Sequence, residues 1–371
     1  MADENPVRFG IMGCAEIARK VARAIHLSPN STLHAVASRS VETAERFASR
    51  NGLSPTVKVY GSYSELLEDP HVDAVYMPLP TTLHLHWAIL AAQNKKHLLL
   101  EKPTALDVGE LDRILEACES NGVQFMDGSM WYHHPRTAKM KELLSDTKRF
   151  GQIKSILKIL LFKIHSSSSY SGNSEFLDNN VRVKPDLDAL GALGDAGWYC
   201  IGAIMWAMNY QPPSTVTALP SISRNSSGVI LSCIASLHWE KEAVVATFFC
   251  SFLAHESMDL AISGSNGSLH LEDFIIPYEE SSAFFTFTSG AKFVDLHVGW
   301  NVKPEETLVE SELPQEAMMV QEFARLVKGV NNSGCKPDCK WPKVSRMSQS
   351  VMDAVIKSIE LGFKPVYAAE F

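Results

Sequence analysis

Residues 7–18 have the sequence VRFGIMGCAEIA, and this stretch decides the fold of the N-terminal part of the chain. Val7–Met12 is a short apolar run typical of a buried strand, and Glu16–Leu27 has the apolar spacing of a helix. Gly13 lies between them, where a tight turn from strand to helix favours a residue without a side chain. This order of strand, glycine turn and helix predicts a dinucleotide-binding fingerprint.

The fingerprint departs from the usual glycine pattern at its second position. Ala15 stands where a glycine normally lets the backbone approach a pyrophosphate, whereas Ala18 at the third position is an accepted variant. On this motif alone, a tight strand–helix turn without a ligand is as good an interpretation. If the motif binds a cofactor, its contacts come from the residues around the helix N-terminus. These are Gly13, Cys14, Ala15, Glu16 and Ile17.

Short apolar runs alternate with helical stretches from this motif to about residue 128. Such alternation predicts a parallel, doubly wound α/β sheet with its ligand at the carboxyl ends of the strands. We therefore expect an N-terminal Rossmann NAD(P)-binding domain over residues 1–130. The expected strands are Val7–Met12, Leu33–Ala37, Val57–Tyr60, Ala74–Met77, His97–Leu100 and Gln124–Met126.

The pattern changes after about residue 150, where strands follow one another without long helices. We expect a second α/β domain over residues 131–371, which carries a large, open, mostly antiparallel sheet. Asn266-Gly267 is a hairpin turn signal, and the polar stretch at residues 166–174 is expected to be a loop. Ala189–Met208 is expected to be a buried helix, and two more helices fall at about 316–328 and 344–361. The expected strands are Val216–Ala218, Val229–His238, Val244–Phe252, Met258–Ile262, Ser268–Leu271, Phe284–Thr288 and Lys292–His297.

Composition excludes some classes of partner. The formal net charge is −8, which argues against nucleic acid and anionic membrane surfaces and leaves small molecules as ligands. The seven cysteines are an odd number, and the acidic N-terminus resembles neither a secretory signal nor a transit peptide. We expect a cytoplasmic protein with free thiols.

Ser38-Arg39 follows the second expected strand. An NAD site usually places a carboxylate there, on the ribose 2′-hydroxyl, whereas an NADP site places a hydroxyl or a cation on the 2′-phosphate. Ser38 and Arg39 fit NADP, with NAD still possible. The alternative is a solvated arginine close to Glu42.

Two further sets of residues can carry chemistry. Glu101-Lys102-Pro103 follows the strand His97–Leu100, so the Lys102 ammonium can stabilise charge on a substrate oxygen. Asp195 and Tyr199 are four residues apart on an apolar helix, which places them on one face. The alternatives are a salt bridge between Lys102 and Glu101, and a structural ion pair beside a core tyrosine.

No metal site is expected, because no histidines or cysteines have the spacing of zinc ligands. His84 and His86 do not share a helix face, and Cys335 and Cys339 have no second pair of ligands nearby.

The order of these motifs resembles the Gfo/Idh/MocA family, the family of glucose–fructose oxidoreductase and inositol dehydrogenase. The resemblance rests on the fingerprint, Pro78-Leu79-Pro80 with His84, Glu101-Lys102-Pro103, and Gly191–Asp195 with Tyr199. It covers nearly the whole chain. Within the family, Tyr199 is typical of the branch of dimeric dihydrodiol dehydrogenases and NADP-dependent xylose dehydrogenases.

The resemblance implies reversible hydride transfer between NADP(H) and an alcohol or carbonyl carbon of a sugar, polyol or cyclic diol. It implies catalytic roles for Lys102, Tyr199 and Asp195, and a homodimer formed through the open sheet. It also adds Pro78, Leu79, Pro80, His84, Glu101 and Lys102 to the cofactor contacts, and Trp131, Tyr132 and Arg182 to the substrate contacts.

This chain departs from the family at two places that affect the substrate. The family's usual Trp/Tyr-Arg pair appears here as Trp131-Tyr132, without the arginine, and the usual Gly-Gly-Gly-Ala is reduced to Ala189-Leu190-Gly191-Ala192. Two alternatives to a dehydrogenase remain, a non-catalytic dinucleotide sensor and an NAD-assisted glycosidase.

Overall fold

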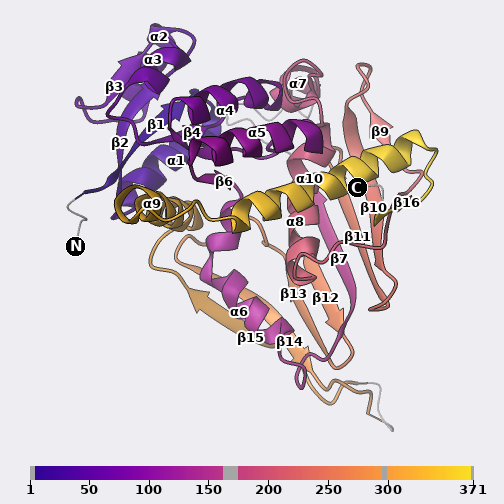
Figure 1. Ribbon diagram of the computed structural model, residues 1–371. Helices are drawn as coiled ribbons and strands as arrows, with labels where there is room; N and C mark the ends of the chain where they lie inside the picture. The colour runs from indigo at the N-terminus through magenta and orange to yellow at the C-terminus, as the bar shows by residue number, and fades with distance from the viewer. Residues whose placement is uncertain (1–4, 162–173, 295–298, 369–371) are drawn as a thin grey trace. The chain divides into compact units, whose positions relative to one another are not determined.

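The computed structural model describes residues 5–161, 174–294 and 299–368 (Figure 1). The chain forms two compact units. Unit 1 comprises Met1–His133 and Leu313–Arg346, and unit 2 comprises His134–Glu312 and Met347–Phe371. The loop expected at residues 166–174 lies outside the described residues, apart from Ser174.

Unit 1 contains a six-stranded sheet with the strand order β3-β2-β1-β4-β5-β6. All its strand pairs are parallel, and this order is that of a doubly wound dinucleotide-binding fold. The predicted Rossmann sheet is confirmed. The strands are β1 (Val7–Met12), β2 (Ser31–Ala37), β3 (Lys58–Tyr60), β4 (Ala74–Met77), β5 (His97–Leu100) and β6 (Phe125–Asp127).

Successive residues of a strand point to opposite faces of the sheet, so side chains on each face can pack against a helix. Helices cover both faces of this sheet. Phe9 in β1 faces Phe323, with ring centroids 5.9 Å apart, whereas the next residue, Gly10, lies against Leu66. Thus α9 lies on one face, with α1 packed against it, and α3 lies on the other (Figure 1). The helices are α1 (Glu16–Leu27), α2 (Val41–Arg50), α3 (Tyr63–Glu68), α4 (His84–Gln93), α5 (Val108–Asn121) and α9 (Gln315–Ser333).

The return of α9 to unit 1 is not visible in the local sequence pattern. The expected domain boundary at residue 130 lies close to His133, where the first segment of unit 1 ends. The later segment, Leu313–Arg346, also belongs to unit 1, where Phe323 is fully buried. Burying a phenylalanine side chain contributes about 1.5–3 kcal/mol, so contacts like this one hold α9 on the sheet.

Unit 2 contains a ten-stranded sheet in the order β15-β14-β13-β12-β7-β11-β10-β8-β16, with β9 paired to β10. Its pairs are antiparallel except for β7 with β11, which confirms the expected mostly antiparallel sheet. The predicted turn at Asn266-Gly267 joins β12 to β13. The strands are β7 (Ile153–Leu161), β8 (Thr215–Ala218), β9 (Ser223–Arg224), β10 (Ile230–Trp239), β11 (Val244–Ser251), β12 (Leu260–Gly264), β13 (Gly267–Leu271), β14 (Ser282–Ser289), β15 (Glu305–Glu310) and β16 (Val366–Tyr367).

Four strands of this sheet were not expected from the sequence, namely β7, β9, β15 and β16, and of these β9 and β16 are only two residues long. β7 carries lysines within its apolar run, and β15 is an edge strand whose residues are mostly exposed, so neither has a clear strand pattern. The strand expected at Lys292–His297 is not formed in its described part, where Phe293 makes only an isolated bridge to Trp300. Its remainder lies outside the described residues.

The apolar stretch expected to be one helix is divided in the structure. Leu193–Gly197 forms a π-helical turn, and α8 (Trp198–Ala207) follows it with every residue buried. Gly191 before this turn has φ +60, and a Cβ there would lie 2.1 Å from the Ile230 carbonyl oxygen of β10. A glycine is therefore required where the turn approaches the sheet.

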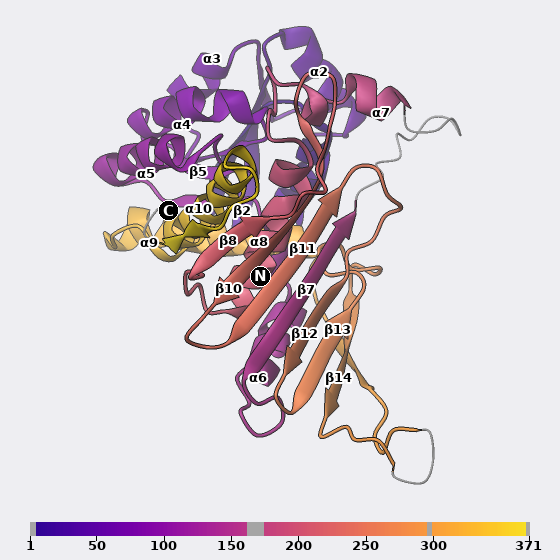
Figure 2. The same cartoon turned by 90° about the vertical axis from the view of Figure 1, so that its right-hand side faces the viewer.

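The sheet of unit 2 has helices on one side in the view of Figure 2, where the strands lie in front of α8 and α6 (Pro135–Leu144). Short helical segments at α7 (Ser174–Asn179) and Val181–Val183 precede α8. The long helix α10 (Lys340–Glu360) begins in unit 1 and ends in unit 2. In the described part of the chain, no helix is both long and apolar enough to cross a membrane.

Candidate active site

The fingerprint forms a cradle at the carboxyl end of β1. Gly13 has φ +123, and a Cβ there would lie 3.0 Å from a side-chain carbon of Leu79. Ala15 is the N-cap of α1, and its side chain makes no capping hydrogen bond. The first amide groups of α1 are therefore not occupied by a side-chain cap, which suits a helix N-terminus that binds a pyrophosphate.

Ser38 and Arg39 follow β2, the strand beside β1. Ser38 contacts the Cys14 thiol, whose pKa is raised by burial and lowered in part by this hydrogen bond. Arg39 lies close enough to Tyr63 to oppose the rise that burial causes in the pKa of that phenol. Glu42 accepts from the Ser40 hydroxyl at 2.6 Å.

The loop after β4 and the loop after β5 are joined by His84. Its Nε2 lies 2.8 Å from the Leu79 carbonyl oxygen, and its Nδ1 lies 3.2 Å from the Thr104 carbonyl oxygen. His84 is only 1% exposed. Its ring therefore holds together the two loops that carry Pro78–Pro80 and Lys102.

Lys102 is the second residue of the loop after β5, and its main chain is held by Glu101. The Lys102 amide donates to Glu101 Oε2 at 3.1 Å, and the Tyr76 hydroxyl donates to Oε1 at 2.6 Å. Burial raises the pKa of Glu101, although the Tyr76 hydrogen bond and the Lys102 charge oppose the rise. The peptide bond between Lys102 and Pro103 is cis.

In unit 2, the structure brings three of the predicted residues together. Arg182 Nε lies 3.0 Å from Asp195 Oδ2, and the carboxylate side chain is 6% exposed. The pKa of Arg182 lies above its usual range because of Asp195, with further contributions from Asp188 and Tyr199. Asp195 lies in the π-helical turn that precedes Tyr199, and such irregular turns are frequent at functional sites.

Trp131 and Tyr132 belong to a short helical segment, Met130–His133, in unit 1. Trp131 is 1% exposed, and its ring centroid lies 3.8 Å from that of Tyr132. Tyr132 also contacts Trp341 edge to face at 5.7 Å. The contact that was expected between this aromatic pair and a substrate stays a prediction.

Two models of one family match this sequence. The model described as "Oxidoreductase family, NAD-binding Rossmann fold" matches residues 7–129, and the model described as "GFO/IDH/MocA C-terminal domain" matches residues 139–270. This chain belongs to the Gfo/Idh/MocA oxidoreductase family. The family resemblance read from the motifs is confirmed.

Several known proteins are similar to this chain over long stretches. An uncharacterized oxidoreductase of Rhizobium meliloti is 28% identical over 362 residues, which cover 96% of this chain and 98% of that protein. The D-xylose 1-dehydrogenase (NADP(+)) 2 of Haloferax volcanii is 35% identical over 196 residues, 53% of this chain and 55% of that enzyme. The crystal structure of a 3-ketoreductase from Actinomadura kijaniata in complex with NADP and TDP-benzene has TM-score 0.76 and 26% identity, and covers 95% of this chain and 98% of that chain.

Sequence reasoning missed two residues of the candidate site in unit 1. Tyr76 is the polar residue of the apolar strand β4, and its hydroxyl bonds Glu101. Gly128 follows β6, and a Cβ there would lie 2.8 Å from Glu101 Oε1. A polar ring near a strand end was the available signal for Tyr76, whereas only the folded structure shows why residue 128 is a glycine.

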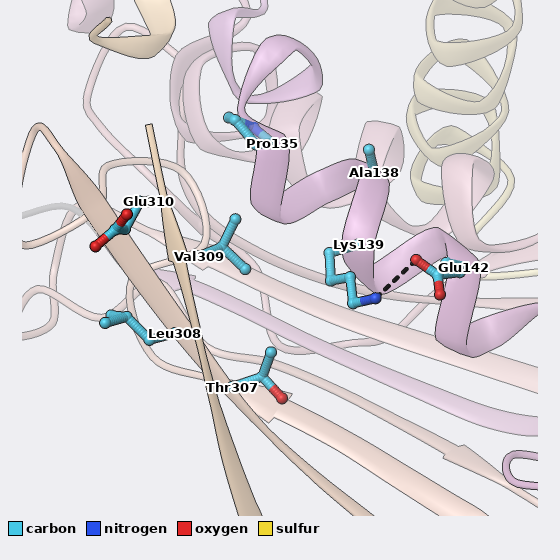
Figure 3. Close-up of a pocket in the computed structure, with 8 residues that line it drawn as sticks. All are labelled: Pro135, Ala138, Lys139, Glu142, Thr307, Leu308, Val309 and Glu310. Atoms are coloured by element: carbon cyan, nitrogen blue, oxygen red, sulfur yellow. Dashed lines mark hydrogen bonds and ion pairs between the residues drawn. The ribbon is translucent and has the colours of Figure 1, made fainter. Parts of the chain in front are cut away.

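A separate cavity of 640 Å³ lies within unit 2, between α6 and β15 (Figure 3). Lys139 is paired there with Glu142 at 2.9 Å, and none of the predicted site residues lines this cavity. It is therefore separate from the candidate site. Its lining residues are Pro135, Ala138, Lys139, Glu142, Thr307, Leu308, Val309 and Glu310.

Proposed function

We propose that this protein is an NADP(H)-dependent oxidoreductase that transfers a hydride to or from a carbon bearing a hydroxyl or carbonyl oxygen. One observation carries the proposal: β1, β2 and β5 of one parallel sheet end at Met12, Ala37 and Leu100, and Gly13, Arg39 and Lys102 follow directly or one residue later. The carboxyl ends of such strands form the ligand crevice of this fold, so a phosphate cradle, a cation and an ammonium line the same edge.

NADP is the cofactor that we propose, with NAD as the alternative. Ser38 and Arg39 offer a hydroxyl and a cation to a 2′-phosphate, and both named relatives of known cofactor, the xylose dehydrogenase and the 3-ketoreductase, use or contain NADP. Glu101 and His84 contribute by holding the loops in place. The proposed cofactor-binding residues are Gly13, Cys14, Ala15, Glu16, Ile17, Ser38, Arg39, Pro78, Leu79, Pro80, His84, Glu101 and Lys102.

The bound cofactor accepts or supplies the hydride, and the protein's own groups handle the proton and the charge. Tyr199 exchanges a proton with the substrate hydroxyl, Lys102 stabilises negative charge on that oxygen, and Asp195 orients them. A tyrosine hydroxyl has a pKa of about 10, so proton exchange near pH 7 requires about 4 kcal/mol of stabilisation of the phenolate. A cation about 4 Å away in a medium of effective dielectric constant about 20 supplies about that much.

The substrate that we propose is a sugar, a polyol or a cyclic diol. The xylose dehydrogenase and the TDP-benzene-bound 3-ketoreductase are similar to this chain, which supports a polyhydroxylated substrate. Tyr132 is half-buried and offers an aromatic ring to a sugar, buried Trp131 supports that ring from behind, and Arg182 offers hydrogen-bond donors to the sugar hydroxyls.

We also propose a homodimer formed through the outer face of the unit 2 sheet. Leu157 in β7 and Val245 in β11 are 47% and 42% exposed, and their inward neighbours Ile156 and Ala246 are buried. Towards the sheet edge, Phe284 pairs with Leu308, and these are 38% and 62% exposed. Exposed apolar residues on a sheet face that lies away from α8 and α6 are typical of an interface (Figure 2).

The cytoplasm is the compartment that we propose, because all seven cysteines are free thiols. Nucleic acid and membrane are not proposed as partners, since the net charge is −8.

Two other functions would use the same fold. A dinucleotide sensor would bind the cofactor and turn nothing over, and an NAD-assisted glycosidase would release product with no net change in cofactor. The lysine at residue 102 favours an enzyme over a sensor.

The test is a screen of aldoses, polyols, nucleotide-linked keto sugars and cyclic diols with NADP⁺ or NADPH. The absorbance of the reduced cofactor measures each reaction. We expect net reduction or oxidation with at least one class. Cofactor binding without turnover across the panel favours the sensor, and glycoside cleavage without net cofactor change favours the glycosidase.

A further inference from the structure

The Lys102 main chain is held by a side chain from its own loop. Its amide donates to Glu101 Oε2 at 3.1 Å. The second carboxyl oxygen of Glu101 is fixed independently, by the Tyr76 hydroxyl at 2.6 Å. Because Tyr76 fixes one oxygen of the Glu101 carboxyl, the other oxygen is also held in a defined position. The position of the Lys102 amide, which donates to that other oxygen, therefore depends on Tyr76.

Tyr76 reaches Glu101 from the neighbouring strand. It lies in β4, paired in register with Leu99 of β5, and is 0% exposed. All the groups concerned belong to unit 1. A buried phenol paired with a carboxyl is geometrically restricted, because neither group exchanges its partner for water at low cost.

Gly128 forms the third side of this arrangement. Its amide donates to the Leu100 carbonyl oxygen at 2.8 Å, which places residue 128 beside the start of the Glu101 loop. A Cβ on residue 128 would lie 2.8 Å from Glu101 Oε1, the oxygen that Tyr76 binds. A side chain there would displace the carboxyl from the tyrosine.

Asp127 is a second acidic group near Glu101. Asp127 accepts from the Ser129 amide at 2.9 Å and from the Ser345 hydroxyl, so it does not compete for the Lys102 amide. Lys102 lies beside the Glu101 carboxyl and lowers its pKa, while Asp127 raises it.

We propose that Tyr76 and Gly128 are positioning residues for Lys102, acting through the Glu101 carboxyl. Tyr76 binds that carboxyl, Gly128 leaves room for it, and it fixes the Lys102 amide. The inference rests on the proposed function, in which Lys102 stabilises charge on a substrate oxygen. A displacement of about 1 Å of such a group costs up to about 100-fold in rate, so the anchor affects turnover without touching substrate.

Two single changes test the anchor by different routes. Tyr76→Phe removes only the hydroxyl, and Gly128→Ala adds the methyl that pushes Glu101 away. Each is expected to lower kcat by roughly 10- to 100-fold, while KM for substrate and the Kd for NADPH change less than about threefold. The matched control is Tyr60→Phe, which removes a phenol–carboxylate hydrogen bond of 2.8 Å to Asp69 elsewhere in unit 1. The control is expected to keep the wild-type kcat.

Two substitutions of Glu101 distinguish anchoring of the Lys102 amide by hydrogen bonds from an effect of the carboxyl charge. In Glu101→Gln, the amide oxygen can accept from Lys102 and the amide nitrogen can donate to the Tyr76 oxygen, so this variant is expected to lose less turnover than Glu101→Leu. Adding Tyr76→Phe to Glu101→Gln removes that partner again and is expected to lower kcat further.

Amide hydrogen exchange gives a readout that does not depend on turnover. Peptides that contain the Lys102 amide are expected to exchange about tenfold faster in Tyr76→Phe and Gly128→Ala than in wild type or Tyr60→Phe. Unchanged exchange in both folded variants overturns the anchor, as does a kcat equal to that of Tyr60→Phe. If wild type turns over no substrate, the proposed function fails, and hydrogen exchange alone decides on the anchor.

Discussion

Arg182 and Asp195 form an ion pair within unit 2, with Arg182 Nε 3.0 Å from Asp195 Oδ2. The sequence analysis placed Arg182 among the expected substrate contacts, and the structure also pairs it with the Asp195 carboxylate. Because Tyr199 also raises the pKa of Arg182, the guanidinium lies within electrostatic reach of the proposed proton carrier.

The first prediction follows from this pair. Arg182→Met keeps much of the bulk and removes the cation, so the Tyr199 phenolate loses stabilisation. The pH at which substrate oxidation reaches half its maximal rate is expected to rise by about one unit, which corresponds to about 1.4 kcal/mol. The measurement is the pH–rate profile of oxidation. Arg224→Met is the control, because that exposed arginine in the same unit bonds the Gly228 carbonyl oxygen. An unshifted profile in folded Arg182→Met contradicts the prediction.

Lys102 and Tyr199 are expected to act as one catalytic unit. Lys102→Met and Tyr199→Phe should each lower turnover by roughly 10²–10⁴, the usual scale of acid–base catalysis. The double variant should be little worse than the worse single variant, because effects within a catalytic unit do not add. Single-turnover hydride transfer measures the rates, and melting temperatures show whether the variants are folded. Full activity in folded Lys102→Met would overturn the mechanism.

Arg39 is expected to set the preference for NADPH over NADH. Arg39→Ala should remove most of that preference, because a hydrogen bond to a charged group contributes about 1.5–3 kcal/mol. Fluorescence titration with both cofactors measures it, and Arg50→Ala, at the far end of α2, is the control. Equal affinities of the unmutated protein for the two cofactors would remove the basis of the prediction.

Leu157 tests the proposed dimer. Its side chain is 47% exposed in β7, at the middle of the unit 2 sheet, so Leu157→Glu should place two charges in a symmetric interface and yield monomers. Val41→Glu is the control, because Val41 is 39% exposed but lies in unit 1. Light scattering at micromolar concentration gives the mass. A wild-type mass of 41.0 kDa would refute a stable dimer.

Lys158 gives a prediction about stability and pH. This fully buried lysine donates to the Met258 carbonyl oxygen at 2.8 Å, and burial lowers its pKa to about 7. The Lys158 amine therefore binds its proton more tightly in the unfolded chain than in the folded protein. The resulting loss in the free energy of unfolding is greatest below pH 7 and disappears towards pH 10. The charged and titratable groups around Lys158 are Cys200, Asp259, Arg136 and Asp273.

Lys158→Met is therefore expected to raise the melting temperature at pH 6, by roughly 2–4 °C for each kcal/mol gained. The gain over wild type should shrink between pH 7 and about pH 10. Lys154→Met serves as the control, because Lys154 lies in the same strand and is exposed. A gain that is the same at pH 6 and pH 9.5 would show that desolvation of this ammonium is not the cause.

The sequence by itself determined the strands of the unit 1 sheet and the candidate site residues that follow those strands. β1, α1, β4 and β5 have the bounds that the apolar pattern predicted, because strand and helix periodicity and glycine turns are local properties. The position of Lys102 after a buried strand is local in the same sense. The candidate site residues that follow the other strands could therefore be predicted from the sequence before the fold was known.

Only the tertiary structure decided which residues meet. Tyr76 binds Glu101 across 25 positions, and β7 pairs with β11 across an even longer interval of chain. No local pattern encodes such contacts, because they depend on which strands become neighbours in the sheet. The same reason explains why the burial of Lys158, the return of α9 to unit 1 and the pairing of Arg182 with Asp195 became visible only in the folded chain.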